Sequence, residues 1–208
     1  MKKRCVIVGG AGIGDYEFIR GLLSEEDYLI FCDCGLKHLK GLGFLADLVI
    51  GDFDSYDDPH LPVETIVLPV IKDDTDTVFA VKEGIRRGFR EFLLIGVIGA
   101  RFDHSLSNVS ILFDLDTKGL HGRIVDDYSE MEVVSKAPAA IPDTFPFFSL
   151  LNLTGTAKGI TIENAKYELQ DAEITCDYQY GVSNEPLPGR TAFVTVREGR
   201  LLLIRDRV

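Results

Sequence analysis

The first 125 or so residues alternate between short apolar runs and segments with a helical period, and this pattern constrains the fold most strongly. Continuous apolar runs are typical of strands buried on both faces of a parallel sheet. The expected strands are Arg4–Val8, Tyr28–Cys32, Asp47–Ile50, Glu64–Val67, Glu91–Val97 and Gly122–Val125. Residues 74–87 and 103–117 repeat apolar side chains at helical spacing. Strands alternating with helices predict an open, mostly parallel α/β sheet with helices on both faces.

The chain after Asp127 has a different pattern. A proline-rich bend precedes short β-rich segments separated by Gly, Asn and Asp, and no segment there has a helical period; these segments are 147–151, 159–162, 173–175, 191–196 and 201–204. The last two flank Arg197–Arg200, which predicts a C-terminal hairpin. We therefore expect an α/β domain over residues 1–128 and a small antiparallel β-sandwich over residues 129–208.

The acidic composition excludes several classes of partner. The formal net charge of −11 repels nucleic-acid phosphates and argues against a polybasic membrane contact. The longest apolar run, Phe92–Ala100, has nine residues, whereas a spanning helix needs roughly 20. A small phosphorylated ligand is compatible with this charge if a divalent cation or a local basic cluster neutralises it.

Two features bear on the compartment. Lys2–Arg4 precede the apolar stretch Cys5–Ile13 as in a signal peptide. However, glycines interrupt the stretch, Asp15 follows at once and no small-x-small cleavage site is present. A first strand running into a glycine loop explains the stretch better. The four cysteines include no C-x-x-C pair, which favours reduced thiols and a cytoplasmic protein.

The glycine loop Gly9–Gly14 would allow the backbone to approach an anion. It departs from G-x-G-x-x-G because Asp15 stands where the last glycine should be. Asp33, about 20 residues later, keeps a dinucleotide site open as an alternative. No G-x-x-x-x-G-K-[ST] sequence is present, so the chain is not a P-loop enzyme.

Charged clusters follow three consecutive strands of the expected sheet, at Gly51–Ser55, Lys72–Asp76 and Gly99–His104. Ligands of open α/β sheets bind beyond the carboxyl ends of the strands. Asp52 and Asp54 project to the same side of an extended segment, and paired carboxylates suit Mg²⁺, although the segment also suits a solvated turn. Helix capping accounts for one or two of the acids in Lys72–Asp76, but not for all three. The Arg101 guanidinium could bind a phosphate through two parallel hydrogen bonds.

Together these motifs resemble the thiamine pyrophosphokinase family in order and spacing over nearly the whole chain. The resembling segments are 33–35, 51–55, 72–76, 99–104 with Asn108, 159–160, 165–169 and 181–185. The resemblance implies an enzyme that uses ATP and Mg²⁺ to transfer a pyrophosphoryl group to the hydroxyl of thiamine, with release of AMP. It also implies a catalytic, nucleotide-binding first domain, a thiamine-binding second domain, and a homodimer with thiamine between subunits.

The resemblance implies roles for individual residues. The metal ligands would be Asp52, Asp54 and Asp76, with Asp73 as a further catalytic carboxylate. A carboxylate of this cluster would act as general base. The ATP side would comprise Asp33, Lys72, Thr75, Arg101, Asp103, His104 and Asn108. Ser183 and Asn184 match the thiamine-side loop. Many members stack thiamine on a Trp, which this chain lacks, so Tyr178 or Tyr180 is predicted to face the thiazolium cation.

Three other interpretations of the same residues stay open. A phosphatase or a sugar-nucleotide transferase could use Asp52 and Asp54 as its metal-binding pair. An oxidoreductase could bind a dinucleotide on the first glycine loop. A non-catalytic nucleotide or thiamine sensor would use the acids only as helix caps.

Overall fold

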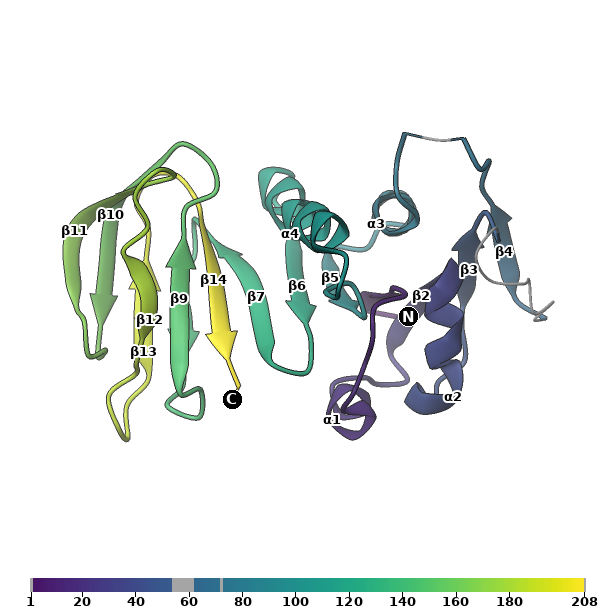
Figure 1. Cartoon of the computed structure of the whole chain (residues 1–208), viewed down its shortest axis with the longest axis horizontal. Helices are drawn as coiled ribbons and strands as arrows, with labels where there is room; N and C mark the ends of the chain where they lie inside the picture. Colours follow the sequence, from purple (N-terminus) through teal and green to yellow (C-terminus); the bar gives the residue numbers. More distant parts are fainter. Residues whose placement is uncertain (1, 54–61, 72, 208) are drawn as a thin grey trace. The chain divides into compact units, whose positions relative to one another are not determined.

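The structure is a computed structural model that describes residues 2–53, 62–71 and 73–207. The chain divides into two compact units, Met1–Asp127 and Tyr128–Val208. The elements of the first unit are β1 (Arg4–Val8), α1 (Tyr16–Gly21), β2 (Asp27–Cys32), the 3₁₀ helix η1 (Asp33–His38), α2 (Leu39–Leu42), β3 (Leu48–Gly51), β4 (Glu64–Val67), α3 (Asp76–Arg86), β5 (Glu91–Ile95), α4 (Phe102–Thr117) and β6 (His121–Val125) (Figure 1).

Within the first unit the strands follow the order β6-β5-β1-β2-β3-β4, and each neighbouring pair is parallel. From β1 the chain continues to β2 on one side, whereas β5 lies on the other side. The strand order therefore reverses between β1 and β5. The crevice beyond the carboxyl ends of these two paired strands is the switch point, where open α/β folds bind ligands.

Helices cover both faces of this sheet. Successive side chains of a strand point to opposite faces, so each buried strand packs against helices on both sides. Val6 and Val8 of β1 pack in one cluster with Ile19 of α1 and Leu42 of α2. Cys5 faces the other way, where a Cβ atom on Gly84 of α3 would lie 3.0 Å from its sulfur. The predicted α/β class is confirmed.

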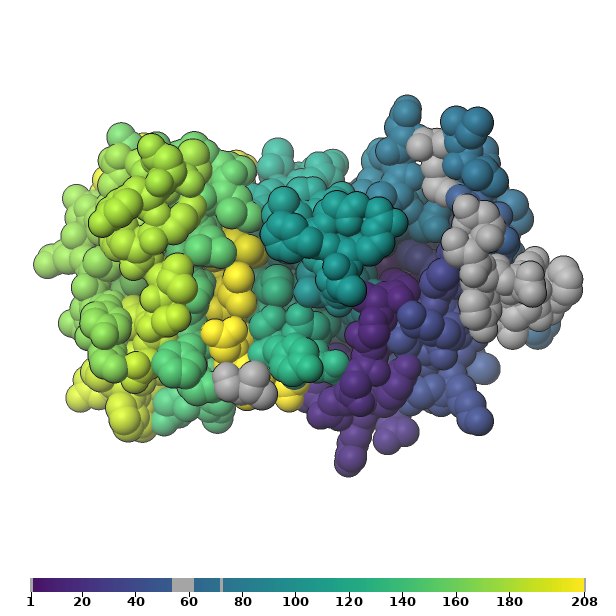
Figure 2. Space-filling view, in the orientation of Figure 1, coloured from purple at the N-terminus to yellow at the C-terminus, as the bar shows by residue number. Residues whose placement is uncertain are grey.

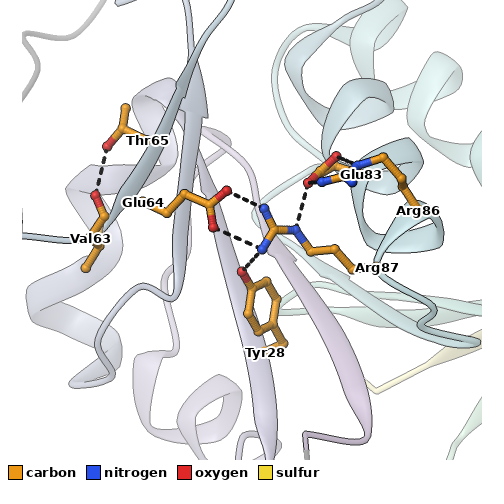
Figure 3. Close-up of polar contacts among 7 residues, drawn as sticks. All are labelled: Tyr28, Val63, Glu64, Thr65, Glu83, Arg86 and Arg87. Carbon is orange, nitrogen blue, oxygen red and sulfur yellow. Dashed lines mark hydrogen bonds and ion pairs between the residues drawn. The ribbon is translucent and has the colours of Figure 1, made fainter.

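Strand β4 differs from the expectation of burial on both faces, because it lies at the end of the strand order. Glu64 and Val67 are exposed. The Arg87 guanidinium donates to Glu64 Oε1 and Oε2 at 2.5 and 3.0 Å, to Glu83 Oε1 at 2.7 Å and to the Tyr28 hydroxyl at 2.8 Å (Figure 3). This network ties the C-terminal end of α3 to β2 and β4.

The second unit consists of two antiparallel sheets, ordered β12-β9-β14-β7 and β11-β10-β13-β8 within the unit. Its strands are β7 (Ser129–Val134), β8 (Ala139–Ile141), β9 (Phe147–Leu151), β10 (Thr156–Glu163), β11 (Leu169–Thr175), β12 (Gly181–Asn184), β13 (Ala192–Thr195) and β14 (Leu201–Asp206). Phe148 and Leu203 from one sheet share a core cluster with Ile160 and Val194 from the other. The predicted β-sandwich is confirmed.

The predicted C-terminal hairpin is wrong. β13 pairs with β10 and β8, whereas β14 pairs with β7 and β9, so the two strands lie in different sheets. The segment between them is held by β10 instead, since Lys158 N donates to Glu198 O at 2.8 Å and Arg197 N donates to Lys158 O at 3.1 Å. The apolar pattern of these two segments predicts a hairpin. It fits equally well two strands that lie in different sheets and face the same core from opposite sides.

Three strands of the sandwich, β7, β8 and β12, were not expected. β8 lies inside the proline-rich bend, and β12 lies inside the segment read only as a loop motif. Across the described parts of the chain, no helix is both long and apolar enough to cross a membrane.

Candidate active site

A cavity of about 510 Å³ opens beyond the carboxyl ends of the central strands of the first unit. Five segments contribute its walls: the glycine loop after β1, the β2–η1 junction, Asp52 after β3, the start of α3, and the segment from the end of β5 into α4. Figure 2 shows a recess between the purple segment that follows β1 and the teal residues of α4. The cavity lies at the switch point.

The backbones of two loops touch beneath this cavity. A Cβ atom on Gly9 would lie 2.6 Å from Gly96 O, and one on Gly96 would lie 2.7 Å from Gly9 O. Gly96 also has a φ of +62°, which glycine adopts readily. These glycines therefore allow the loops after β1 and β5 to meet without side chains between them.

Three carboxylates from three elements converge in the cavity. Asp33 begins η1, Asp52 follows β3 and Asp76 begins α3, and one oxygen from each lies within 4.8 Å of the others. Gly51 makes this approach possible, because a Cβ atom there would lie 3.0 Å from Asp33 Cβ. The sequence assigned Asp33 to the nucleotide side; the structure groups its carboxylate with Asp52 and Asp76.

Asp33 is the most buried of the three, at 8% exposed. Its Oδ2 accepts a hydrogen bond from the Cys34 thiol at 3.4 Å, while its buried Oδ1 has no hydrogen-bond partner among the residues that the structure describes. Burial raises the pKa of Asp33, and repulsion from Asp76 and Asp52 raises it further. A buried carboxylate beside two others is stabilised by a cation, and hard oxygen ligands suit Mg²⁺.

The start of α3 supports this cluster. Thr75 caps the helix, since its hydroxyl accepts from Val78 N at 3.3 Å, and Thr75 and Thr77 both line the cavity. Asp74 binds Lys82 at 2.5 Å, and Asp73 is exposed and lies outside the carboxylate cluster. The predictions for Asp54 and Lys72 fall outside the described residues.

The segment from β5 to α4 contributes polar groups to the opposite wall. Asn108 is buried and donates to Val97 O at 2.8 Å. Arg101 and His104 line the cavity, whereas Asp103 does not. Asp103 forms an exposed ion pair with Arg101 at 2.7 Å, and the hydrogen bond from Arg101 lowers its pKa. The structure therefore brings Arg101, His104 and Asn108 to the cavity with the carboxylates.

The residues predicted for thiamine lie in the second unit. Tyr178 and Tyr180 are 69% and 42% exposed, with ring centroids 5.5 Å apart, and the Tyr180 hydroxyl donates to Glu173 O at 2.5 Å. Ser183 is exposed and has a φ of +58°. Asn184 is buried; its Nδ2 donates to Tyr167 O, and its Oδ1 accepts from the amides of Tyr167 and Glu185.

Sequence reasoning missed several residues of the cavity. Ser105 holds the wall together, because Gly99 N donates to its hydroxyl oxygen at 3.0 Å and that oxygen lies 3.1 Å from both Gly99 O and Arg101 O. A serine in the first turn after a glycine loop is a usable signal for such an anchor. Gly9–Gly12 also line the cavity, in keeping with the expectation that this loop lets the backbone approach an anion.

Comparison with known proteins gives two matching family models. The model described as thiamin pyrophosphokinase, catalytic domain, matches residues 19–123, and the model described as thiamin pyrophosphokinase, vitamin B1 binding domain, matches residues 136–201. The curated thiamine pyrophosphokinase of Bacillus subtilis is 23% identical over 196 residues, which cover 90% of this chain and 91% of that protein.

Solved structures agree on the fold. A thiamine pyrophosphokinase from Bacillus subtilis has a TM-score of 0.85 at 23% identity and covers 99% of this chain and 100% of its own. One from Geobacillus thermodenitrificans has a TM-score of 0.83 at 25% identity, with 98% and 97% covered. The yeast structure has a TM-score of 0.77 at 12% identity, with 99% and 86% covered. The chain belongs to the thiamine pyrophosphokinase family.

Proposed function

We propose that the protein is a magnesium-dependent enzyme that transfers the pyrophosphoryl group of ATP to the hydroxyl of thiamine and releases AMP. The observation that carries this proposal is the convergence of Asp33, Asp52 and Asp76 in a cavity at the switch point of a parallel sheet. A triphosphate is strongly negative and the protein carries a net charge of −11. A divalent cation between carboxylates and phosphates removes that conflict.

The donor set fits such a cation. Asp33, Asp52 and Asp76 would hold it, and Asp54 keeps its sequence-based assignment as a further ligand. The unpartnered Asp33 Oδ1 and the raised pKa of Asp33 support this assignment. When bound, the cation supplies charge neutralisation and a fixed orientation for the transferred group.

In the proposed reaction, the hydroxyl oxygen of thiamine forms a bond with the β-phosphorus of ATP. The bond between that phosphorus and the oxygen shared with the α-phosphate breaks, and AMP leaves with the electron pair. The hydroxyl proton passes to a carboxylate of the cluster. The protein contributes mainly by aligning the two oxygens and by stabilising charge.

Positive and dipolar groups around the cavity would complete the ATP site. Arg101 exchanges its exposed ion pair with Asp103 for a phosphate oxygen, and His104 donates a further hydrogen bond. Thr75 orients the first turn of α3, whose backbone amides favour negative charge. Asn108 supports the wall through Val97 O. Lys72 and Asp73 keep their sequence-based roles beside the phosphates.

The second unit would bind thiamine, in keeping with its match to a vitamin B1 binding domain model. We assign the aromatic surface for the thiazolium cation to Tyr178 and Tyr180. Ser183 would contact thiamine directly. Because the Asn184 amide already bonds to the backbone at Tyr167 and Glu185, Asn184 would order this loop. A homodimer with thiamine between subunits completes the proposal, and the free cysteines suit the cytoplasm.

The test is incubation of the full chain with ATP, Mg²⁺ and thiamine, with the products identified by mass. AMP with thiamine diphosphate supports the proposal, whereas ADP or inorganic phosphate contradicts it. Asp52→Asn separates the enzyme from a sensor. The enzyme loses turnover on this change, whereas a sensor binds nucleotide equally well with and without Mg²⁺ in both proteins.

A further inference from the structure

Two residues at the end of η1 bind the glycine loop from outside the cavity. The Lys37 ammonium donates to Gly10 O at 2.5 Å, and His38 Nε2 lies 2.7 Å from Ala11 O. His38 is only 2% exposed. The other ring nitrogen, Nδ1, lies 2.6 Å from the hydroxyl of Tyr16, the first residue of α1.

The partners of His38 define its protonation. A carbonyl oxygen only accepts, so Nε2 must carry a hydrogen and donate it to Ala11 O. Burial lowers the pKa of His38, which keeps the ring neutral. In the neutral ring Nδ1 is an acceptor, and the Tyr16 hydroxyl donates to it. Tyr16 therefore fixes the tautomer that the glycine loop requires.

The same loop is fixed from its other side by β5 and the residue after it. Gly9 N donates to Ile95 O at 2.9 Å, and Ala11 N donates to Gly96 O at 2.7 Å. The carbonyls of Gly10 and Ala11 are thus bound to η1, while amides of Gly9 and Ala11 are bound at β5. With these carbonyls engaged, their oxygens are directed away from a polyanion in the cavity.

We propose that His38 is a positioning residue for the ATP site, which, with Tyr16 behind it and Lys37 beside it, holds the loop Gly9–Gly12 in the conformation that accepts the triphosphate. This inference rests on the proposed function. It assigns no contact between His38 and a substrate; the residue acts through the Ala11 carbonyl. When that bond is lost, the peptide is free to turn its oxygen toward the phosphates.

The experiment compares three variants in the full chain. His38→Leu removes both hydrogen bonds, His38→Gln retains a donor near the Nε2 position, and Tyr16→Phe removes only the hydroxyl. Mg·ATP binding is measured by calorimetry, and kcat and KM are measured for both substrates. Ile19→Val, which removes one methyl from the same core, is the matched control, and thermal melting shows that each variant is folded.

We expect His38→Leu to raise both the Kd and the KM for Mg·ATP about tenfold, the effect of one lost buried hydrogen bond. kcat and the KM for thiamine stay within about twofold. His38→Gln recovers most of the affinity, and Tyr16→Phe shifts it in the same direction by less. Tyr16→Phe keeps the aromatic ring of residue 16 and its packing. It therefore tests the inference even if His38→Leu does not fold.

Unchanged Mg·ATP binding in His38→Leu or, if that variant does not fold, in Tyr16→Phe overturns the inference. Equal shifts for ATP and thiamine, or an equal shift in Ile19→Val, assign His38 to general stability and overturn it as well. A wild-type protein that binds Mg·ATP but makes no thiamine diphosphate contradicts the proposed function and leaves this test in force. A wild-type protein that binds no Mg·ATP overturns both.

Discussion

One buried polar side chain in each unit, Asp33 in the first and Asn152 in the second, shows two different ways of burying a polar group. Asp33 of the first unit is 8% exposed, and its buried Oδ1 has no hydrogen-bond partner within the described part of the chain. Asn152 of the second unit is fully buried; its Nδ2 donates to Ile174 O at 2.6 Å and Gly155 O at 3.2 Å, and its Oδ1 accepts from Thr154 N at 3.0 Å. A buried amide whose hydrogen bonds are all made supports the fold, whereas the unpartnered oxygen of Asp33 fits the cation binding that we propose.

The largest expected effect follows from removing a carboxylate of the cluster. Asp33→Asn or Asp52→Asn should lower kcat/KM by a factor of about 10³, since a bound cation supplies several kcal/mol of charge stabilisation. Steady-state assays with ATP and thiamine measure this. Loss of less than about tenfold in both variants would contradict the site.

In the absence of a metal ion, Asp33→Asn should keep or raise the free energy of unfolding, although it lowers activity. The folded-state pKa of Asp33 is raised by burial and by its acidic neighbours. Ionised Asp33 therefore destabilises the metal-free fold above that pKa, and the stability contribution recovers as the pH falls through it. Denaturant unfolding in EDTA at neutral pH should show Asp33→Asn to be at least as stable as the wild type.

Asn152→Ala should lower stability and leave activity unchanged, the reverse of what we expect for Asp33→Asn. Deleting this amide removes its hydrogen bonds to Ile174 O, Gly155 O and Thr154 N, which should lower the free energy of unfolding by about 2–3 kcal/mol. Activity per folded molecule at a permissive temperature stays within about twofold. Denaturant unfolding and active-site-normalised assays check both. A variant as stable as the wild type would remove the contrast between the units.

A change to the tyrosine pair tests the second unit's own proposed contribution to binding. Replacing Tyr178 and Tyr180 with Leu should raise the KM for thiamine about tenfold, because an aromatic face for the cation is lost, while the KM for ATP is unchanged. Phe193→Leu, a partly exposed aromatic of strand β13, is the matched control. Unchanged thiamine kinetics would remove the tyrosines from the site.

The smallest expected effects concern ion pairs, first those of Figure 3 and then an exposed pair in the second unit. Hydrogen bonds from Arg86 lower the pKa of buried Glu83 below its ordinary value of 4.5. Its stabilisation is therefore present above that value and is lost as the pH falls through the lowered pKa. Glu83→Gln should cost about 1 kcal/mol at pH 7. Denaturant unfolding should show this cost shrinking as the pH falls through the lowered pKa of Glu83. In the second unit, Glu185→Gln at the exposed Lys166 pair should leave the free energy of unfolding almost unchanged, because solvent screens an exposed pair.

The sequence predicts the first unit better than the second for a physical reason. β1 and β4 have their predicted bounds. β1 is a buried apolar run that ends at two glycines. In the sandwich, Leu201–Asp206 and Ala192–Thr195 are individually recognisable, but their strand partners lie 30 or more residues away in the chain. Local patterns carry no information on such pairing, so the hairpin prediction was wrong.

The same limit applies to the candidate site. The strand-end rule predicted that Asp52, Asp76, Arg101 and His104 would meet, and they line one cavity. Placing Asp33 beside Asp52 requires knowing that β2 and β3 are neighbours and that Gly51 leaves room for it. The contact of His38 with Ala11 depends on how η1 turns back on β1, for which the sequence has no signal.

The most direct test of the account is a cation titration of the full chain without nucleotide. Mn²⁺, used in place of Mg²⁺ and followed by its paramagnetic resonance signal, should bind one site per chain in the wild type, and Mg²⁺ should displace it. Asp33→Asn and Asp52→Asn should each weaken binding by at least tenfold, while Asp143→Asn, in the second unit, should not. Binding that is absent from the wild type, or equal in all four proteins, would contradict the assignment of the three carboxylates to a cation.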